Sequence, residues 1–291
     1  MAAVALAAVP SAASQIAGPS VAVRTDPAVP MQGGVAWLVV RPTEQGGDSV
    51  TAVEGAAAGE PLHFLRRGEG LVALVAAPLE GGDSLEVVLR LIRAGCTDTV
   101  RLALELGRPE LGSEQLRVPP RMTVFDSATE ARIQRELARS RAISVASHAT
   151  PQLWRAPFRR PRASRITSPY GTAREYNGQV TSRHLGTDFA GAVGAPVAAA
   201  ARGVVALVAD FYLAGHAVYL DHGGGLVTGY FHLSRIDVAQ GDTVTAGQPI
   251  GRVGRSGRVT GPHLHWIARY GTITVDPMGL VALPAEPAEG R

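Results

Sequence analysis

The sequence contains no lysine, so all 28 of its basic residues are arginine. A phosphate-binding loop of the Walker type uses a lysine to reach the phosphates. Schiff-base enzymes also need a lysine, and so do carriers that hold biotin or a lipoyl group on a swinging arm. The missing residue therefore excludes all three of these function classes.

Cysteine is almost absent as well. The one cysteine, Cys96, permits neither an intramolecular disulfide nor a cysteine-based zinc cage. It follows Ala94 and Gly95 beside an apolar run, which predicts a buried structural thiol. Beyond the N-terminus, no stretch reaches the roughly 20 apolar residues that cross a bilayer, so we expect no stable membrane insertion.

The N-terminal segment, residues 1–17, is rich in alanine and apolar. It resembles the hydrophobic part of a secretory signal, but no basic residue precedes the apolar run as a signal normally requires. Two interpretations stay open for it: a signal remnant or a disordered tail.

The remaining composition predicts a mostly β protein. The chain of 291 residues is 46% hydrophobic and carries 34 Gly and 20 Pro, which favour many turns and short strands. We expect a sandwich-like β domain at residues 18–118, with strands at Gly34–Arg41, Ser49–Val53, Leu62–Leu65, Leu71–Ala77, Ser84–Arg93 and Val100–Leu106. His63 in this domain is expected to be a packed core or edge residue.

Residues 119–163 are expected to link two domains. Ser127 and Glu130 have the spacing of a capping box, which predicts a helix over Ser127–Ile143. His148 beyond it is expected to be isolated and solvated. The following stretch, Trp154–Arg165, holds five Arg interrupted by Pro157 and Pro161. It is interpreted either as a solvated linker or as a segment attracted to an anionic polymer; without aromatic stacking residues or a recognition motif, no nucleic acid partner is expected.

Residues 164–280 again alternate short apolar runs with Gly turns, and residues 281–291 form a tail. Six of the eight histidines lie between His184 and His265. Side chains alternate across a strand, so His263 and His265 share one face while Leu264 points to the core. His184 and Asp188 add a nitrogen and an oxygen donor, a set that suits catalytic zinc and also ferrous iron.

His232 ends an apolar strand, where it is placed to hydrogen-bond an attacking water or a developing oxyanion. His216 and His222 are interpreted as turn or supporting residues.

The C-terminal region resembles the M23 family of zinc metallopeptidases, the lysostaphin-like peptidoglycan endopeptidases. The similarity rests on an ordered series: Ser168-Pro-Tyr-Gly171 with Arg174, His184-x-Gly-x-Asp188, Gly194-Ala-Pro-Val197, Tyr230-x-His232-Leu233, Gly241-Asp-x-Val244, Gly251-x-x-Gly254 and Gly261-Pro-His-Leu-His265.

This resemblance implies a two-sheet β fold with a groove above a Zn²⁺ ion. It implies His184, Asp188 and His265 as zinc ligands, His232 and His263 as catalytic histidines, and Arg174 and Tyr176 as groove residues. The expected substrate is a stem peptide or peptide cross-link of bacterial peptidoglycan, cut in the cell envelope at a periplasmic or extracellular location. Two alternatives are a non-catalytic wall-binding protein or activator of another hydrolase, and a polymer-binding β domain. The bond that is cut and the oligomeric state stay open.

Overall fold

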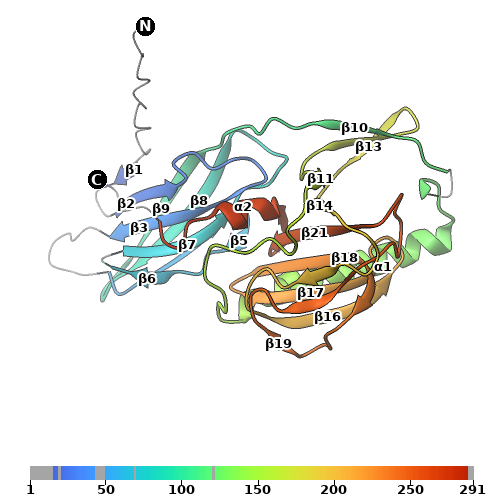
Figure 1. Cartoon of the computed structure of the whole chain (residues 1–291). Coiled ribbons are helices and arrows are strands. Elements are labelled where there is room, and N and C mark those ends of the chain that lie inside the picture. Colours follow the sequence, from blue (N-terminus) through green and yellow to red (C-terminus); the bar gives the residue numbers. More distant parts are fainter. Residues whose placement is uncertain (1–15, 19–20, 43–49, 69, 120–121, 288–291) are drawn as a thin grey trace, which may run out of the picture.

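The computed structural model describes residues 16–18, 21–42, 50–68, 70–119 and 122–287. Residues 1–15 of the N-terminal segment and residues 288–291 of the C-terminal tail lie outside these ranges. Within them the chain is mostly β, as predicted, and its strands fall into several sheets (Figure 1). Among these residues, no helix has the length and apolar character that crossing a bilayer requires.

The N-terminal half is a sandwich of two antiparallel sheets with strand orders β1-β2-β3-β7-β6 and β5-β4-β8-β9. Its core is formed by apolar side chains from both sheets, such as Leu38, Val75, Val87 and Leu104. The strands are β1 (Ile16–Gly18), β2 (Val21–Asp26), β3 (Val35–Pro42), β4 (Ala52–Ala57), β5 (Glu60–Pro61), β6 (Leu65–Arg67), β7 (Gly70–Ala76), β8 (Ser84–Ile92) and β9 (Thr97–Glu105).

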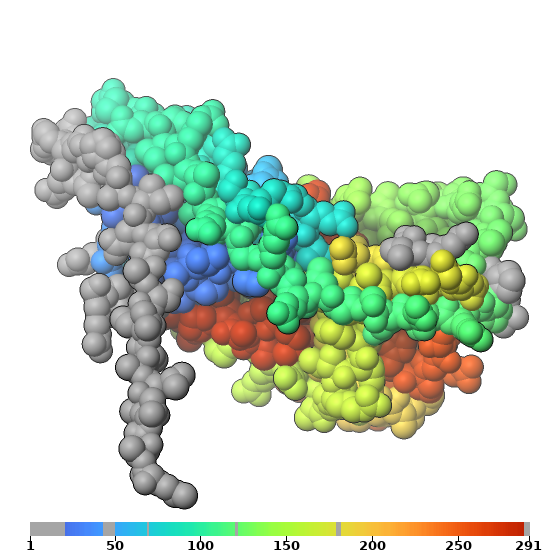
Figure 2. Space-filling view, turned by 90° about the horizontal axis from the view of Figure 1, so that it is seen from above, coloured from blue at the N-terminus to red at the C-terminus, as the bar shows by residue number. Residues whose placement is uncertain are grey.

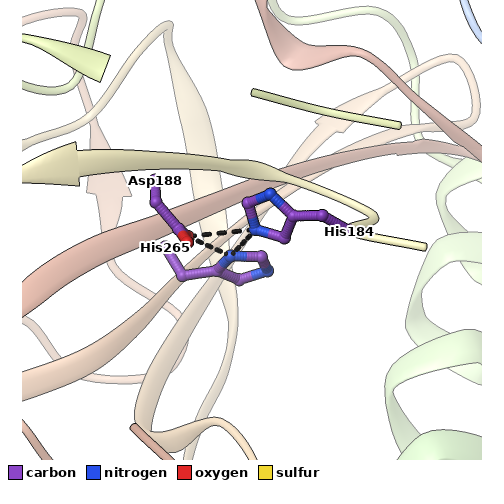
Figure 3. A group of neighbouring side chains, drawn as sticks. All are labelled: His184, Asp188 and His265. Carbon is purple, nitrogen blue, oxygen red and sulfur yellow. Dashed lines mark hydrogen bonds and ion pairs between the residues drawn. The ribbon is translucent and has the colours of Figure 1, made fainter. Parts of the chain in front are cut away.

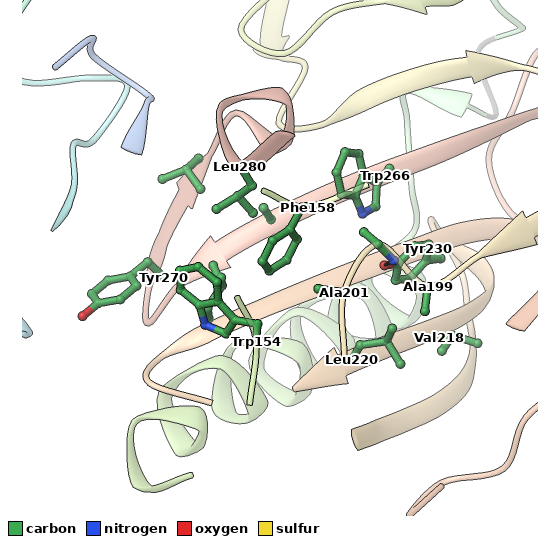
Figure 4. Close-up of a cluster of buried hydrophobic side chains, with 14 of the residues drawn as sticks. Trp154, Phe158, Ala199, Ala201, Val218, Leu220, Tyr230, Trp266, Tyr270 and Leu280 are labelled. Carbon is green, nitrogen blue, oxygen red and sulfur yellow. Dashed lines mark hydrogen bonds between the residues drawn. The ribbon is translucent and has the colours of Figure 1, made fainter. Parts of the chain in front are cut away.

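Strand β3 is buried on both faces, which explains its unbroken apolar run. Ala36 and Leu38 point into the sandwich core, whereas Val35 and Trp37 join a second core that belongs mainly to the C-terminal half. The Trp37 ring stacks on Trp154 at 5.8 Å between ring centroids. The two halves are therefore joined by one continuous hydrophobic cluster, part of which Figure 4 shows around Trp154, Phe158 and Trp266.

The connector (residues 107–126, of which 107–119 and 122–126 are described) leads from the sandwich to the C-terminal half. Its strand β10 (Ser113–Leu116) pairs in parallel with β12 (Ala173–Tyr176), which itself pairs with β13 (Gln179–Arg183). Figure 2 shows the connector in green on the surface, beside the yellow segment that holds β12 and β13. The sequence-based division at residue 118 stays a prediction.

The predicted helix is confirmed as α1 (Ser127–Ala146), three residues longer than expected at its C-terminal end. Its N-cap is Asp126 rather than Ser127, because the Asp126 carboxylate accepts a hydrogen bond from the Thr129 amide at 2.7 Å. The capping box expected from Ser127 and Glu130 was therefore placed one residue late. α1 covers one face of the large sheet, where Ile143 packs on the cluster formed by Phe211, Tyr219 and Phe231.

The C-terminal half is built on a sheet whose main path runs β11-β14-β21-β18-β17-β16-β19. β15 and β20 pair beside it, and β22 pairs with β21. The elements are β11 (Ile166–Ser168), β14 (Thr187–Ala190), β15 (Pro196–Ala198), β16 (Gly203–Phe211), β17 (Gly215–Gly223), β18 (Leu226–Ile236), β19 (Thr243–Val244), β20 (Pro249–Val253), β21 (His263–Tyr270), β22 (Ile273–Val275) and the short helix α2 (Pro277–Ala282).

The prediction of a buried Cys96 was wrong. Cys96 is exposed, because it lies in the turn between β8 and β9 rather than in either strand. In the Arg-rich segment Trp154 and Phe158 are buried in the shared core while Arg155, Arg159 and Arg160 are exposed, so both interpretations of its arginines stay open.

His148 is neither isolated nor solvated, contrary to expectation. Its Nε2 lies 2.9 Å from Glu60 Oε2, and its Nδ1 lies 2.8 Å from His63 Nε2. Glu60 also accepts a hydrogen bond from the Thr272 amide at 2.8 Å. These groups come from the sandwich, from the turn after α1 and from the β21–β22 hairpin, so they form an interdomain cluster.

Candidate metal centre

Two neighbouring strands bring the predicted site residues together. β14 pairs antiparallel with β21, so that Asp188 lies opposite His265 and Ala190 lies opposite His263. Leu264 and Trp266 point to the other face of β21, where both side chains are fully buried. The alternation expected for this strand is confirmed, and it turns both histidines toward the same side of the sheet.

His184, Asp188 and His265 converge through one donor atom each (Figure 3). His184 Nε2 lies 2.9 Å from His265 Nδ1 and 3.1 Å from Asp188 Oδ1. His265 Nδ1 lies 2.7 Å from the same carboxylate oxygen. Two imidazole nitrogens and one carboxylate oxygen are a suitable donor set for a metal with an open fourth position.

The ring of His184 is oriented by its second nitrogen. Nδ1 lies 3.0 Å from the Pro169 carbonyl oxygen and 3.1 Å from Ser168 Oγ. Because a carbonyl oxygen can only accept, Nδ1 must carry the hydrogen, and a neutral ring then presents a lone pair at Nε2. Such an outer hydrogen bond is what fixes the tautomer of metal-binding histidines.

Gly186 makes the close approach of the two ligand segments possible. A Cβ atom at this position would lie 2.6 Å from His265 Cε1 and 2.8 Å from the Trp266 carbonyl oxygen. Both distances are shorter than van der Waals contact, so any larger residue would displace the His265 ring or its strand. The glycine in the His184-x-Gly-x-Asp188 pattern therefore has a packing role.

The charge states suit cation binding. Burial raises the pKa of Asp188, but the contacts with His184 and His265 outweigh it, so the net pKa lies below its ordinary range and the carboxylate is ionised. Burial lowers the pKa of His265, and the opposing effect of Asp188 does not cancel it. His265 is therefore a neutral imidazole at pH 7, which is the form that binds a metal.

His232 reaches the site through a β-bulge. The pairing of β17 with β18 shifts here: His216 lies opposite Leu233 and Val218 lies opposite Tyr230, so β18 has one residue more than β17 between the two pairs. His232 itself has a φ of +61°, a left-handed conformation that is uncommon for a residue with a side chain. The extra residue keeps His232 on the site face beside Phe231 and returns Leu233 to the core.

His232 and His263 face each other beside the three donors, with 4.9 Å between their ring centroids. Their Nδ1 atoms each donate to a main-chain carbonyl at 2.9 Å, Ser256 for His232 and Gly261 for His263. His263 Nε2 lies 3.6 Å from Asp188 Oδ1. Burial, together with the charges of His265 and His263, lowers the pKa of His232 to about 3, so that ring is neutral at pH 7.

Asp188, His232, His263 and His265 line a groove of about 630 Å³. Its walls include Arg174 and Tyr176 of β12, together with parts of α1 and of the connector. Arg174 also makes an ion pair with Asp188, and the Tyr176 ring carries the guanidinium of Arg258 at 5.7 Å from the ring centroid.

His216 and His222 do not enter the site. His222 is fully buried, donates from Nδ1 to the Arg202 carbonyl at 2.7 Å, and lies 2.8 Å from Thr228 Oγ1 through Nε2. Burial lowers its pKa to about 4, consistent with the structural role expected from the sequence. Sequence reasoning used Ser168 only as part of the Ser168-Pro-Tyr-Gly171 motif and gave no role to Ser256, because a contact made through a single hydroxyl or carbonyl does not show in the sequence.

Comparison with known proteins agrees with this geometry. The model of peptidase family M23 matches residues 182–277. The peptidoglycan DD-endopeptidase ShyA of Vibrio cholerae is 45% identical over 105 residues, which cover 35% of this chain and 24% of that protein. The DD-carboxypeptidase/endopeptidase Mpg of Neisseria meningitidis is 42% identical over 121 residues, which cover 42% of this chain and 28% of that protein.

The chain thus matches only about a quarter of the length of these curated relatives. One solved structure is similar over almost its whole length. It is a protein from Pseudomonas aeruginosa assigned to peptidase M23, and it is 30% identical, with a TM-score of 0.64 over 87% of this chain and 94% of the other. From the matched segment, the shared fold and the convergent residues together, the chain belongs to peptidase family M23.

Proposed function

We propose that this protein is a zinc-dependent endopeptidase that hydrolyses peptide bonds of bacterial peptidoglycan in the cell envelope. The observation that carries the proposal is the convergence of His184 Nε2, Asp188 Oδ1 and His265 Nδ1 beside two further histidines whose orientations are fixed. The substrate class is supported by the printed activities of the relatives from Vibrio cholerae and Neisseria meningitidis.

His184, Asp188 and His265 would hold the zinc ion, because their donor atoms lie within 4.8 Å of one another. When bound at such a site, zinc polarises the scissile carbonyl and lowers the pKa of a coordinated water to ~7. Ferrous iron accepts a similar donor set, but three protein ligands of this kind, together with the resemblance to zinc peptidases, favour zinc.

The two neighbouring histidines, His232 and His263, would orient the attacking water and transfer its proton. Because each donates from Nδ1 to a carbonyl, a neutral ring offers its Nε2 lone pair to the groove. His263 lies closer to the ionised Asp188, and its Nε2 takes the proton of the attacking water. His232 accepts a hydrogen bond from the same water and orients it. The proton on His263 is then donated to the leaving nitrogen as the C–N bond breaks, which leaves a carboxylate and an amine.

The alternative, a non-catalytic protein that binds the wall or activates another hydrolase, is less well supported. Such a role does not require the full donor set, whereas the three donors converge, and Asp188, His265 and both helper histidines line one groove.

The first prediction concerns metal removal. We expect the purified protein to contain about one zinc per chain and to cleave defined muropeptides, with products identified by mass spectrometry. Treatment with a chelator should abolish cleavage, and added Zn²⁺ should restore it. A protein that binds no metal after reconstitution, or that leaves every muropeptide intact when loaded with zinc, would overturn the proposal.

A further inference from the structure

Arg174 not only lines the groove, because its guanidinium also contacts one donor residue, Asp188, and the Ser168 hydroxyl that supports another, His184. Its Nη2 lies 2.9 Å from Asp188 Oδ2 and 3.4 Å from Ser168 Oγ. Ser168 Oγ in turn lies 3.1 Å from His184 Nδ1. One guanidinium nitrogen therefore reaches Asp188 directly and His184 through a buried hydroxyl.

As a result, the two oxygens of the Asp188 carboxylate have different partners. Its Oδ1 faces His184, His265 and His263, while its Oδ2 is taken by Arg174. A carboxylate with two free oxygens can rotate and bind a metal through one or both of them. The contact with Arg174 removes this freedom and leaves one oxygen for the centre.

Arg174 is itself held from the connector. The register of β10 on β12 places Glu114 opposite Arg174, and Glu114 Oε2 lies 3.7 Å from Arg174 Nε. That Nε atom is buried and makes no hydrogen bond among the described residues. The guanidinium thus lies between two carboxylates, one on the connector and one at the centre, and its positive charge is balanced.

We propose that Arg174 is a positioning residue of the metal centre, which fixes Asp188 for binding through one oxygen, and that Glu114 of the connector orients Arg174. This inference rests on the proposed zinc site. A planar guanidinium can bridge Asp188, Ser168 and Glu114 at fixed angles, whereas a lysine ammonium is a point charge on a flexible chain.

A positioning role of Arg174 and a purely electrostatic role predict opposite changes in zinc affinity when Arg174 is replaced. If Arg174 acted only as a positive charge, its removal would strengthen the binding of a cation. Loss of a group that orients a metal ligand instead weakens metal binding by about 10–100-fold. The sign of the change therefore decides between them.

The test measures zinc affinity by competition with a chelator in the full-length chain. Arg174→Gln should raise the zinc Kd by about 10–100-fold, and Arg174→Lys should not restore the wild-type value. Glu114→Gln should weaken binding in the same direction but less. Arg258→Gln is the matched control, because it removes an arginine from the same groove that contacts Met122 and Tyr176 instead of a donor residue. Its zinc Kd should equal that of the wild type.

A second readout reports on coordination. Loading with Co²⁺ gives a visible absorption whose intensity falls as the coordination number rises, and we expect a weaker band for Arg174→Gln than for the wild type, because the freed carboxylate can bind through both oxygens. Unchanged or tighter zinc binding in Arg174→Gln, or full retention in Arg174→Lys, would overturn the inference.

The outcomes separate this inference from the proposed function. Wild-type protein that binds zinc but cleaves no peptide, with the expected loss of affinity in Arg174→Gln, refutes the function and supports the positioning role. Normal peptide cleavage by the wild type, together with an unchanged zinc affinity of Arg174→Gln, supports the function and refutes the positioning role. Wild-type protein without affinity for zinc refutes both.

Discussion

Main-chain carbonyls set the orientation of the histidines at this centre. Pro169, Ser256 and Gly261 each accept a hydrogen bond from an Nδ1 atom, of His184, His232 and His263 respectively. His265 differs, because its Nδ1 is the atom that faces the donors. Two histidines of the same strand therefore use different nitrogens. His265 is a proposed ligand through Nδ1, whereas His263, two positions earlier, turns Nε2 toward the groove.

This difference gives a prediction for the two neighbours. His265→Ala should lose both zinc and muropeptide cleavage, since one of three donors is removed. His263→Ala should lose cleavage by about 10²–10⁴-fold, the usual contribution of a general base, yet keep its zinc. Metal analysis and product quantification on both variants test the assignment, and equal zinc loss in the two would show that the roles are wrongly divided.

The residue types at the site could be predicted from the sequence, whereas their supports could not. His184, Asp188 and His265 stand out because few side chains bind metals and their spacing matches a known pattern. Ser168 and Glu114 are ordinary polar residues, and only the pairing of β10 with β12 brings Glu114 near Arg174. Such contacts depend on register between distant segments, which a single sequence does not encode visibly.

At the scale of the element, β21 positions two site residues through its opposite face. Leu264 lies between His263 and His265 and is fully buried in the shared core with Trp266 and Phe189. The regular alternation of β21 made its orientation predictable. β18 was not predictable in the same way, since regular alternation would put His232 on the core face with Tyr230, and nothing in the sequence marks the bulge.

We therefore predict that Leu264→Ala destabilises the protein by about 2–5 kcal/mol, the cost of a cavity at a buried leucine. It should also weaken zinc binding, because the strand that carries His263 and His265 loses its anchor. Leu264→Met serves as the control with conserved volume and should cost less than about 1.5 kcal/mol. Urea unfolding and chelator competition measure the two effects, and a stable Leu264→Ala variant with normal affinity would contradict the prediction.

At the scale of the molecule, polar groups as well as the apolar core join the sandwich to the C-terminal half. Glu60 accepts from Thr272, and His148 lies between Glu60 and His63. Tyr270 donates to the Pro61 carbonyl at 2.6 Å and packs edge-on against His148. Composition and local patterns predicted two β regions and a helix between them, but not this contact, because His63 and His148 lie far apart in the sequence.

The cluster predicts a pH dependence of stability. Burial, and then the charge of His148, lowers the pKa of His63 below its ordinary 6.5, so the folded protein favours the neutral ring. The unfolded chain binds the proton more readily, and stability is therefore lost as the pH falls from about 6.5 through the lowered value. The pKa of Glu60 is also lowered, although burial opposes this, because Thr272 and His148 stabilise its charged form; its contribution is lost only below 4.5.

His63→Gln keeps a donor for His148 Nδ1 but cannot titrate. Its melting temperature should fall less than that of the wild type between pH 8 and pH 5. Every other histidine is the same in both proteins, so the difference between the two curves isolates His63. His216→Gln, at an exposed histidine, is the control and should follow the wild type. Parallel curves for His63→Gln and the wild type would argue against the cluster as the origin of the effect.

The stacking of Trp37 on Trp154 has a consequence for how such chains diversify. A chimaera that joined this C-terminal half to an unrelated partner would expose Trp154 and the apolar surface around it, and would tend to aggregate. Exchange between homologous chains should succeed only when both tryptophans, or a matched pair of replacements, are inherited together. The sandwich and the C-terminal half would then be inherited together, although the proposed chemistry takes place only in the C-terminal half.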